Sequence, residues 1–352
     1  MSLAAQRTGM KLVFFLAICA GLNGMAQSTP PGAAALGYTL CVINEKPSAA
    51  DIAPGNNGDY KWFNGQWWET PPAVTNYSTV SNILDLSLGG DLVSTPRDFS
   101  TGVLPVLPGT NGFYVEFDEQ LSDNDPDHWP AVWLMPVEHT AQQQDCYPGD
   151  PADFERWMEF DVDEGGWGPG LLGTVHNWTG IWPDYSSIQN PNNESTNTLD
   201  RSQKHTFGGS YDPVHQTTAW WVDGVYQMSA GSPYVPAVAA QQHFYLILSA
   251  QSRGENKPYT MAVSGVRAYV PVNALSLQLV TPLLHNTSAT AQSFTLTWNA
   301  LSGQSYQVQC STNLWTTNWN NLGNPITATN WSVSVSLAVT NTPRFFRVSL
   351  QL

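Results

Sequence analysis

The chain has 352 residues, of which 42% are hydrophobic and 12% charged, and its formal net charge is −15. This length and apolar content predict a folded core with room for one sizeable domain and a small second one. An acidic chain with so few lysines and arginines is a poor candidate for binding nucleic acid or an anionic membrane surface, so we expect neither as a partner.

The first 26 residues have the pattern of a signal peptide. Arg7 and Lys11 precede an apolar run that ends at Ala20, and the small residues Gly24 and Ala26 mark a cleavage site. The apolar run is too short to anchor the chain in a membrane. We therefore expect residues 1–26 to be removed and the protein to be secreted, into the extracellular space or the periplasm.

Three cysteines follow this segment: Cys41, Cys146 and Cys310. Export permits disulfides, but the number of cysteines is odd. A Cys41–Cys146 bridge and three isolated thiols are both compatible with the sequence. No Cys/His spacing resembles a zinc site, and we expect no metal and no cofactor.

The first part of the mature chain mixes loops with short strands. Residues 27–59 are rich in Pro, Gly and Asn and loop-like, apart from a short strand expected at Thr39–Asn44. Tyr60–Trp68 is strongly aromatic; it either caps a cleft or packs beneath loops, and we favour the second interpretation. Ile83–Leu88 and Gly112–Phe117 alternate like strands of a sandwich.

The segment His128–Pro136 is predicted to be a strand with two unlike faces. Its tryptophans, Trp129 and Trp133, share one face, while Val132 and Leu134 occupy the other. The following residues, 136–154, form an expected loop that carries Asp145, Asp150 and Asp153. Such a loop could hold a structural calcium ion, but acidic loops are more often simply solvated, so calcium is not predicted.

The stretch WMEFDVDE, residues 157–164, organises the chain. As a strand it places Trp157, Glu159 and Asp161 on one face, opposite the apolar Met158, Phe160 and Val162. Regular alternation would send Glu164 into the core, where no partner is evident. A one-residue β-bulge at Asp163 would instead return Glu164 to the acidic face and leave Asp163 at the strand edge. Gly165-Gly166 could also end the strand early.

Further along, Thr174, His176 and Trp178 alternate on one face of the next predicted strand. Residues 179–205 are polar and rich in Asn, which indicates a surface loop. Asp223-Gly224 is a strong two-residue hairpin signal between two strands. His243–Gln251 is continuously apolar and is predicted to be a central strand.

A domain boundary is expected between Pro271 and about Leu279. Residues 280–352 are dominated by Thr, Ser, Asn and Val and contain short alternating runs, which predicts a small C-terminal β-sandwich. The run that begins at Tyr306, YQVQCSTNLW, resembles a C-terminal module of many secreted bacterial enzymes. Such modules anchor, space or bind carbohydrate.

Five segments in order resemble glycoside hydrolase family 16, the laminarinase, lichenase, agarase and carrageenase group. EFDVDE resembles its E-x-D-x-x-E signature, and the other four segments are HWPAVWLMP, GTVHNW, AWWVDGVYQ and MAVSGVRAYV. Together they cover roughly residues 110–272. The resemblance implies an all-β, concanavalin-A-like curved β-sandwich (a jelly roll) over residues 27–272, with the acids on the concave sheet.

The resemblance also implies roles for individual residues. Glu159 would be the nucleophile, Glu164 the general acid/base and Asp161 their helper. The expected substrate contacts are Trp129, Trp133, Trp157, His176 and Trp178. The sequence departs from the family at Met158, where many relatives have Gly, and in YVEFDE (residues 114–119), which lacks an expected Arg. The segment ENKPYT replaces a Gly/Trp-rich run common in glucanases, which argues against a glucan substrate.

The leading hypothesis is a monomeric, secreted, endo-acting retaining β-glycosidase that cleaves internal linkages of a polysaccharide. The low positive charge favours a neutral or lightly charged substrate. A non-catalytic lectin on the same fold is the alternative, because a fold does not determine a function. A lectin, however, has no need of two glutamates flanking an aspartate in one row. A purely structural secreted β-protein is the third possibility.

Overall fold

A computed structural model gives the fold. It describes residues 28–351 except 56–57, 59, 67–75, 81–82, 97–103, 141–144, 166–167, 272–292, 300–304, 312–318, 329–331 and 339–344. The predicted signal peptide and most of the predicted domain boundary therefore lie outside the described residues.

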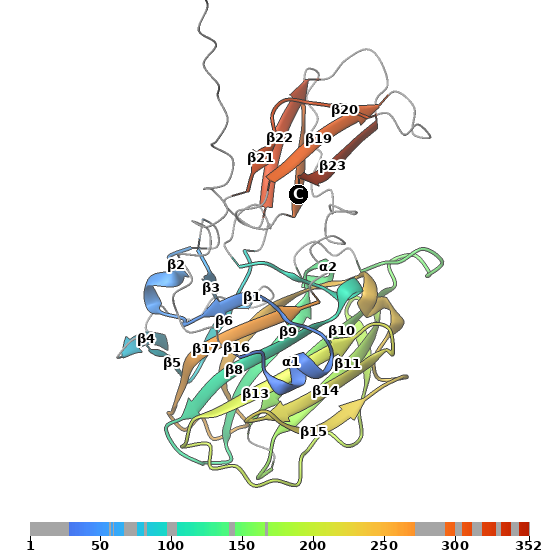
Figure 1. The fold of residues 1–352 in the computed structure, drawn as a ribbon. Coiled ribbons are helices and arrows are strands. Elements are labelled where there is room, and N and C mark those ends of the chain that lie inside the picture. Colours follow the sequence, from blue (N-terminus) through green and yellow to red (C-terminus); the bar gives the residue numbers. More distant parts are fainter. Residues whose placement is uncertain are drawn as a thin grey trace, which may run out of the picture. The chain divides into compact units, whose positions relative to one another are not determined.

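Two stacked β-sheets make up the main body of the protein (Figure 1). Counting described residues only, the first sheet has eight strands: in spatial order β15 (Val225–Ala230), β14 (Thr217–Val222), β13 (His205–Asp212), β8 (Phe113–Leu121), β17 (Thr260–Val270), β5 (Ile83–Ser87) and β4 (Tyr77–Val80), with β1 (Leu40–Glu45) paired to β17.

The second sheet carries the acidic strand. Within the same described ranges it has nine strands: β12 (Asp184–Gln189), β11 (Leu172–Ile181), β10 (Glu155–Glu164), β9 (His128–Pro136), β16 (His243–Ser252), β6 (Gly90–Val93), β3 (Trp62–Asn64) and β2 (Ile52–Ala53), with β7 (Leu107–Pro108) paired to β16. Neighbouring strands are antiparallel except β2 and β3, which are parallel.

Helices contribute little. Those in the described ranges are α1 (Pro31–Ala35), α2 (Val137–Thr140) and the short 3₁₀ segments η2 (Ala49–Asp51), η4 (Gly109–Asn111) and η5 (Ala237–Gln241). None of the helices in the described ranges has the length and apolar character needed to span a membrane.

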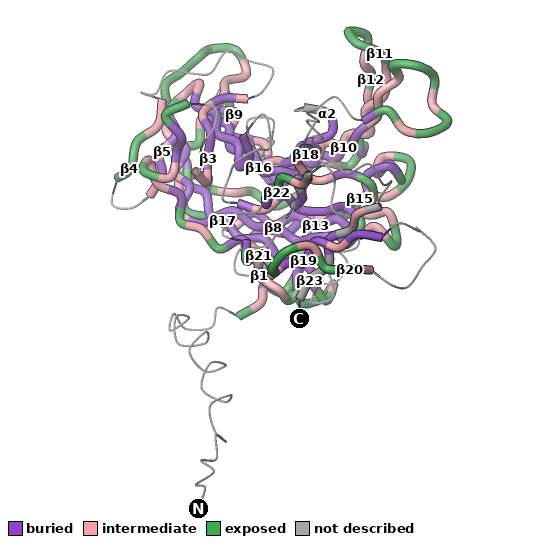
Figure 2. Tube along the Cα trace, turned by 90° about the horizontal axis from the view of Figure 1, so that it is seen from above, coloured by how far each residue is buried: buried purple, intermediate pink, exposed green. Residues whose placement is uncertain are grey.

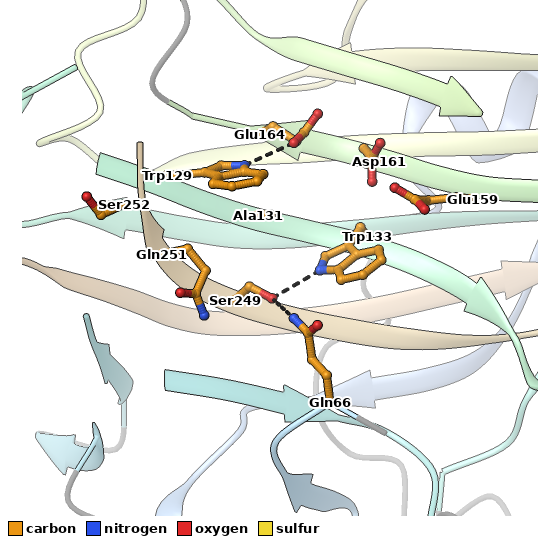
Figure 3. Close-up of a pocket in the computed structure, with 10 residues that line it drawn as sticks. All are labelled: Gln66, Trp129, Ala131, Trp133, Glu159, Asp161, Glu164, Ser249, Gln251 and Ser252. Carbon is orange, nitrogen blue, oxygen red and sulfur yellow. Dashed lines mark hydrogen bonds between the residues drawn. The ribbon is translucent and has the colours of Figure 1, made fainter. Parts of the chain in front are cut away.

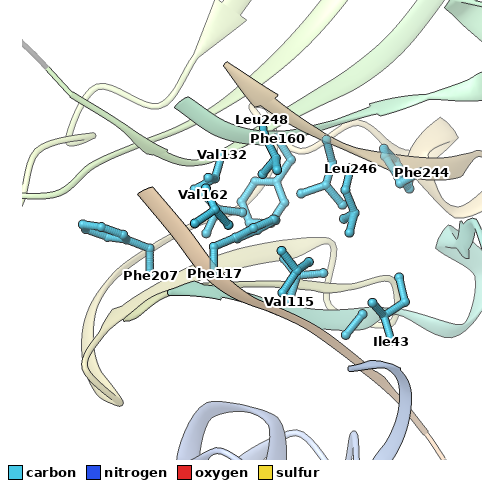
Figure 4. Close-up of a cluster of buried hydrophobic side chains, with 14 of the residues drawn as sticks. Ile43, Val115, Phe117, Val132, Phe160, Val162, Phe207, Phe244, Leu246 and Leu248 are labelled. Carbon is cyan, nitrogen blue, oxygen red and sulfur yellow. The ribbon is translucent and has the colours of Figure 1, made fainter. Parts of the chain in front are cut away.

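The main core lies between the two sheets. Phe160 and Val162 of β10 meet Val115 and Phe117 of β8 across the sandwich (Figure 4). Alternate residues of each strand supply this core, as expected when one face of a sheet is buried. Most residues of β8, β9, β16 and β17 are buried, whereas the ends of the β11–β12 hairpin are exposed (Figure 2). The predicted all-β sandwich is confirmed.

Most of the individual strands agree with the sequence patterns, and the Asp223-Gly224 turn does as well. Both turn residues have positive φ angles, 51° and 77°. This combination is typical of the two-residue hairpin turn that Asp-Gly favours. In the aromatic segment, Trp62 and Phe63 are buried, but they lie on strand β3 of the second sheet and Trp62 belongs to the main core, whereas the favoured interpretation placed them beneath loops. Its residues Trp67 and Trp68 lie outside the described residues.

The expectation that residues 179–205 form only a loop is wrong. The first part of this segment completes β11, and Asp184–Gln189 is the edge strand β12, paired with it. β12 is DYSSIQ, and its side chains are exposed or only partly buried. A strand that is solvated on both faces has no apolar alternation, so the sequence carries no signal for it.

The C-terminal strands form two small sheets around a core of their own. β18 (Ser293–Asn299) pairs with β22 (Ser332–Ala338), and β19 (Ser305–Ser311) pairs with β20 (Asn320–Asn321), β21 (Ile326–Thr327) and β23 (Phe345–Gln351). Trp298 of β18 and Tyr306 of β19 belong to one buried hydrophobic cluster. This is the arrangement predicted for a small β-sandwich.

All three cysteines in the described ranges are free thiols. Cys41 and Cys146 are exposed and Cys310 is buried. Of the two alternatives left by the sequence, the structure has isolated thiols and no Cys41–Cys146 bridge.

We predict that a chain ending at Val272 folds and unfolds cooperatively by itself. The larger sandwich has its own core, and domains with their own core usually survive such cuts. Circular dichroism and thermal unfolding of the shortened and full-length proteins would test this. A shortened chain that is insoluble, or that unfolds without a cooperative transition, would contradict it.

Candidate active site

A β-bulge interrupts strand β10 between Asp161 and Glu164. On one side, Asp161 faces Trp133 and Asp163 faces the next residue of β9, Val132, so β10 has one residue more than its partner. The pairing with β11 shifts by one residue over the same stretch. The predicted bulge is confirmed, with Val162 as the extra residue against β9, one position before the expected Asp163.

The bulge places Glu164 on the same face as Glu159 and Asp161. Figure 3 shows the three acids in a row along β10, with Asp161 between the two glutamates. The opposite sheet makes room for the bulged strand at Gly209 of β13. A Cβ atom there would lie 2.8 Å from side-chain atoms of both Phe160 and Val162, so a larger residue would clash.

Asp163 is not at the strand edge, and that expectation is wrong. Its side chain is fully buried and receives two hydrogen bonds from Arg201, at 2.6 and 3.0 Å. Arg201 also donates to the main-chain oxygens of Gly170, at 3.1 Å, and Glu164, at 3.5 Å. The inward position therefore does have a partner, and the same guanidinium ties the bulge to neighbouring backbone.

A cleft opens over the row of acids. One cavity of about 300 Å³ and another of about 530 Å³ are both lined by Trp129, Glu159 and Glu164, so the acids lie where the two cavities meet. Polar side chains line the rest of the cleft on each side. They are Gln66, Ser249, Gln251 and Ser252 in the first cavity, and Thr174, His176, Gln189, Asn193, Glu194 and Arg253 in the second.

Each glutamate is held by an indole N–H. Trp178 donates to Glu159 Oε2 at 2.9 Å, and Trp129 donates to Glu164 Oε1 at 2.9 Å. Thr174 adds a longer bond of 3.4 Å to Glu164 Oε2. Two of the tryptophans predicted to contact sugar thus also orient the carboxyl groups, a function that the sequence analysis did not foresee.

Asp161 is buried beneath the two glutamates. No hydrogen-bond donor among the described residues reaches its Oδ2 atom, and the imidazole Nε2 of His176 lies 3.5 Å from that atom. The same Nε2 atom is 4.0 Å from Glu159 Oε1. Burial lowers the pKa of His176 to about 4, so its imidazole is neutral at neutral pH.

Burial favours the protonated forms of the acids in the row. Burial raises the pKa of Glu159 to about 7, with a further increase from the charge of Glu164 and a decrease from the Trp178 N–H. Burial likewise raises the pKa values of Asp161 and Glu164, and the two glutamates add to the shift of Asp161. Because the three groups interact, their protons belong to the row rather than to single residues.

Glu159, Asp161 and His176 also offer ligand atoms within 4.8 Å of one another, so a metal ion could bind them. Binding there would occupy the carboxylate oxygens that face the cleft. A metal at this place would therefore compete with acid–base chemistry at the row rather than assist it.

The expectation that Trp157 contacts substrate does not hold in this structure. The residue lies on the cleft face of β10 but is only 3% exposed. His139 stacks near its ring at a centroid distance of 3.5 Å, and Trp178 stacks near it at 5.6 Å. Tyr185 packs edge-on against it. Trp157 is therefore a support for Trp178.

The other predicted contacts do reach the cleft. Trp129 and Trp133 line the first cavity, and His176 lines the second. Trp178 is half-buried beside Glu159. Trp133 donates a hydrogen bond to the Ser249 hydroxyl at 3.1 Å, which fixes the orientation of its ring.

Arg253 also lines the cleft, although it is not among the residues expected there from the sequence. Its guanidinium lies 3.9 Å from the centroid of the Trp129 ring and 3.8 Å from Glu164 Oε1. Burial lowers the pKa of Arg253 to about 10, against the opposing effects of Glu164 and Asp161, so it remains charged at neutral pH. No sequence signal marks this residue, but period-two alternation in β16 could have placed Ser249 and Gln251 in the cleft.

Solved structures with similar folds include three enzymes. They are a β-porphyranase from the human gut bacterium Bacteroides plebeius (15% identity, 65% of this chain, 94% of that chain, TM-score 0.44), the kappa-carrageenase of Pseudoalteromonas carrageenovora (16%, 56%, 83%, 0.40) and the laminarinase of Rhodothermus marinus (18%, 65%, 96%, 0.39).

No family model and no curated protein matches the sequence. Carrageenase and laminarinase are two of the groups named by the motif resemblance. At these identities and TM-scores the matches do not decide the chemistry of this protein, which rests on the side chains of the cleft.

Replacing Glu159 by glutamine is expected to stabilise the protein at alkaline pH. The pKa of Glu159 is raised in the folded state, so ionisation disfavours folding as the pH rises from about 4.5 to 7. Glu159→Gln should therefore increase the free energy of unfolding by about 1–3 kcal/mol at pH 8 and change it little at pH 4. Urea unfolding at the two pH values measures this.

The exposed Glu194→Gln, the same chemical change at the cleft rim, is the control and should show little pH-dependent gain. An equal effect of Glu159→Gln at pH 4 and pH 8 would mean that burial does not penalise this carboxylate.

Replacing Arg201 by methionine is expected to destabilise the protein by about 3–5 kcal/mol, because Asp163 would be left buried and unpaired. Adding Asp163→Leu should recover most of this loss in urea unfolding, because the buried carboxylate of Asp163 would then be absent as well. Arg156→Met, which breaks a half-exposed pair with Asp150, should cost less than about 1 kcal/mol. A double variant that is as unstable as Arg201→Met alone would show that the unpaired Asp163 is not the cause of the loss.

Proposed function

We propose that the protein is a secreted, endo-acting retaining β-glycosidase of the family 16 type that cleaves internal linkages of a polysaccharide. The observation that carries the proposal is the bulged row on β10, in which two glutamates flank an aspartate under an open cleft. Each glutamate accepts a hydrogen bond from its own indole, which supports two separately oriented carboxyl groups.

Retention of the anomeric configuration requires two successive displacements at the anomeric carbon of the sugar. Glu159 attacks the anomeric carbon while Glu164 protonates the departing glycosidic oxygen, which gives a covalent glycosyl ester on Glu159. Glu164, now ionised, then removes a proton from water, and the resulting attack releases the sugar and regenerates Glu159. Asp161 lies between the two glutamates and moderates which of them holds the proton.

In the site without substrate, the neighbouring charges influence whether Glu159 or Glu164 holds the proton. Arg253 lies 3.8 Å from Glu164 and favours its ionised form, whereas the basic group found within 4.0 Å of Glu159 in the described part of the chain is the neutral imidazole of His176. The reaction needs the reverse, with Glu159 ionised and Glu164 protonated. We infer that substrate binding shifts a proton along the row toward Glu164, with the raised pKa of Asp161 making it a suitable relay.

The cleft supports a long substrate. Cavities on both sides of the acids leave room for a sugar chain to continue in both directions, as endo cleavage requires. Trp133 offers an aromatic surface beside the acids, and amide side chains such as Gln251 and Asn193 suit sugar hydroxyls. Together with the net charge of −15, this supports a neutral or lightly charged polysaccharide.

The proposal is tested by incubating purified protein with β-glucans, agars, carrageenans and porphyran and measuring new reducing ends. We expect oligosaccharides of several lengths from at least one polymer, and none from Glu159→Gln. Saturable sugar binding without any cleavage would instead support the lectin alternative. NMR of the first products gives the anomeric configuration, and inversion would contradict the two-step mechanism.

Azide rescue assigns the two glutamates. On a substrate with a good leaving group, Glu164→Ala plus azide should give a β-glycosyl azide, since Glu159 still forms the intermediate. Glu159→Ala should give the α-azide, because azide then replaces the nucleophile directly. Exchange of the two products would mean that Glu164, next to Arg253, is the nucleophile. Normal activity in Glu164→Ala with β-azide rescue of Asp163→Ala would overturn the assignment of Glu164.

A further inference from the structure

A second group of possible metal ligands lies away from the row of acids, at the start of β10. His139 from α2, Asp145 from the following loop and Glu155, the first residue of β10, each offer one ligand atom, and these atoms lie within 4.8 Å of one another. Asp145 is fully buried, while His139 and Glu155 are partly buried.

Two carboxylate oxygens in this group have no hydrogen-bond donor in the described part of the chain. Asp145 uses its Oδ2 atom to contact His139 Nδ1 at 2.7 Å, but within the described residues its Oδ1 atom has no donor, and neither does Oε2 of Glu155. Buried carboxylate oxygens without partners are costly, so such an arrangement calls for a cation or a proton. The adjacent Arg156 does not supply it, because its Nε donates to Asp150 at 2.8 Å.

The donor atoms indicate which cation would fit. One imidazole nitrogen with two carboxylates matches the mixed ligands that zinc and related transition metals accept. Calcium prefers six to eight oxygen ligands, and an imidazole is unsuited to it. We propose that His139, Asp145 and Glu155 form a binding site for one divalent transition-metal ion of the zinc class, separate from the cleft acids.

The site would have a defined place in the architecture. His139 stacks on Trp157, Trp157 stacks on Trp178, and Trp178 donates its N–H to Glu159. A metal ion bound to His139 would fix the first ring of this column. Because His139 comes from α2 and Glu155 from β10, an ion would also join these two elements.

Metal binding by the full-length protein tests the proposal without any activity measurement. Protein dialysed against a chelator is titrated with Zn²⁺ by calorimetry, and with Co²⁺ while its visible absorption is recorded. We expect one equivalent of either ion to bind, ligand-field bands from bound Co²⁺, and much weaker binding of Ca²⁺. Absence of Zn²⁺ and Co²⁺ binding would overturn the proposal.

Variants locate the ion. Asp145→Asn and Glu155→Gln should each weaken Zn²⁺ binding by at least about 10-fold, the lower end of the loss seen even for residues that only support metal ligands. Asp153→Asn, the same charge change at an exposed position in the same loop, should leave the affinity unchanged. Because Glu155 is only partly buried, its variant keeps the test decisive if Asp145→Asn fails to fold.

Two results would contradict this location. Binding that is lost in His176→Gln but retained in Asp145→Asn would place the ion at the cleft acids, which form the other ligand group. Glu155→Gln that stabilises the protein in chelator while wild type binds no Zn²⁺ would show that the two carboxyl groups share a proton instead.

Discussion

The pair formed by Arg201 and Asp163 is the interaction on which the candidate active site depends. The extra residue in β10 turns one additional side chain toward the core, and that side chain is the carboxylate of Asp163. Its burial is tolerable because the guanidinium of Arg201 donates two hydrogen bonds to it, and the same guanidinium also donates to the main-chain oxygens of Glu164 and Gly170. Without that ion pair, the bulge that places Glu164 in the cleft would not be stable.

Ionisation of the row of acids lowers the stability of the folded protein. Burial raises the pKa values of all three carboxyl groups, so their ionisation at neutral pH disfavours the compact structure. The indoles of Trp129 and Trp178 offset part of this by donating hydrogen bonds. Such a conflict between local stability and charge placement is typical of sites that carry out acid–base chemistry.

Much of this site could be predicted from the sequence because strands have a simple period. The apolar residues Met158 and Phe160 determine which face of β10 is buried, and the odd spacing between Asp161 and Glu164 indicates a bulge. Arg201 could not be found in this way. It lies 38 residues from Asp163 in a polar segment without periodicity, and only the packing of the two sheets brings them together.

Trp157 illustrates another limit. Alternation identifies its face correctly, but whether that face is open depends on His139 and Tyr185, which come from a short helix and an edge strand. Neither element has a period that reveals where it lies. Hence the sequence assigned a sugar-contact function to a ring that other aromatic rings cover.

The two indole N–H donors limit which residues can replace Trp129 and Trp178. In many carbohydrate clefts one aromatic ring can substitute for another, because a flat surface is all that is needed. Here a phenylalanine at position 129 or 178 would keep the surface and lose the N–H that orients a carboxylate, and tyrosine would place its hydroxyl elsewhere. Descendants of this protein should therefore tolerate exchange among aromatic residues less readily at these two positions than their location beside a cleft would suggest.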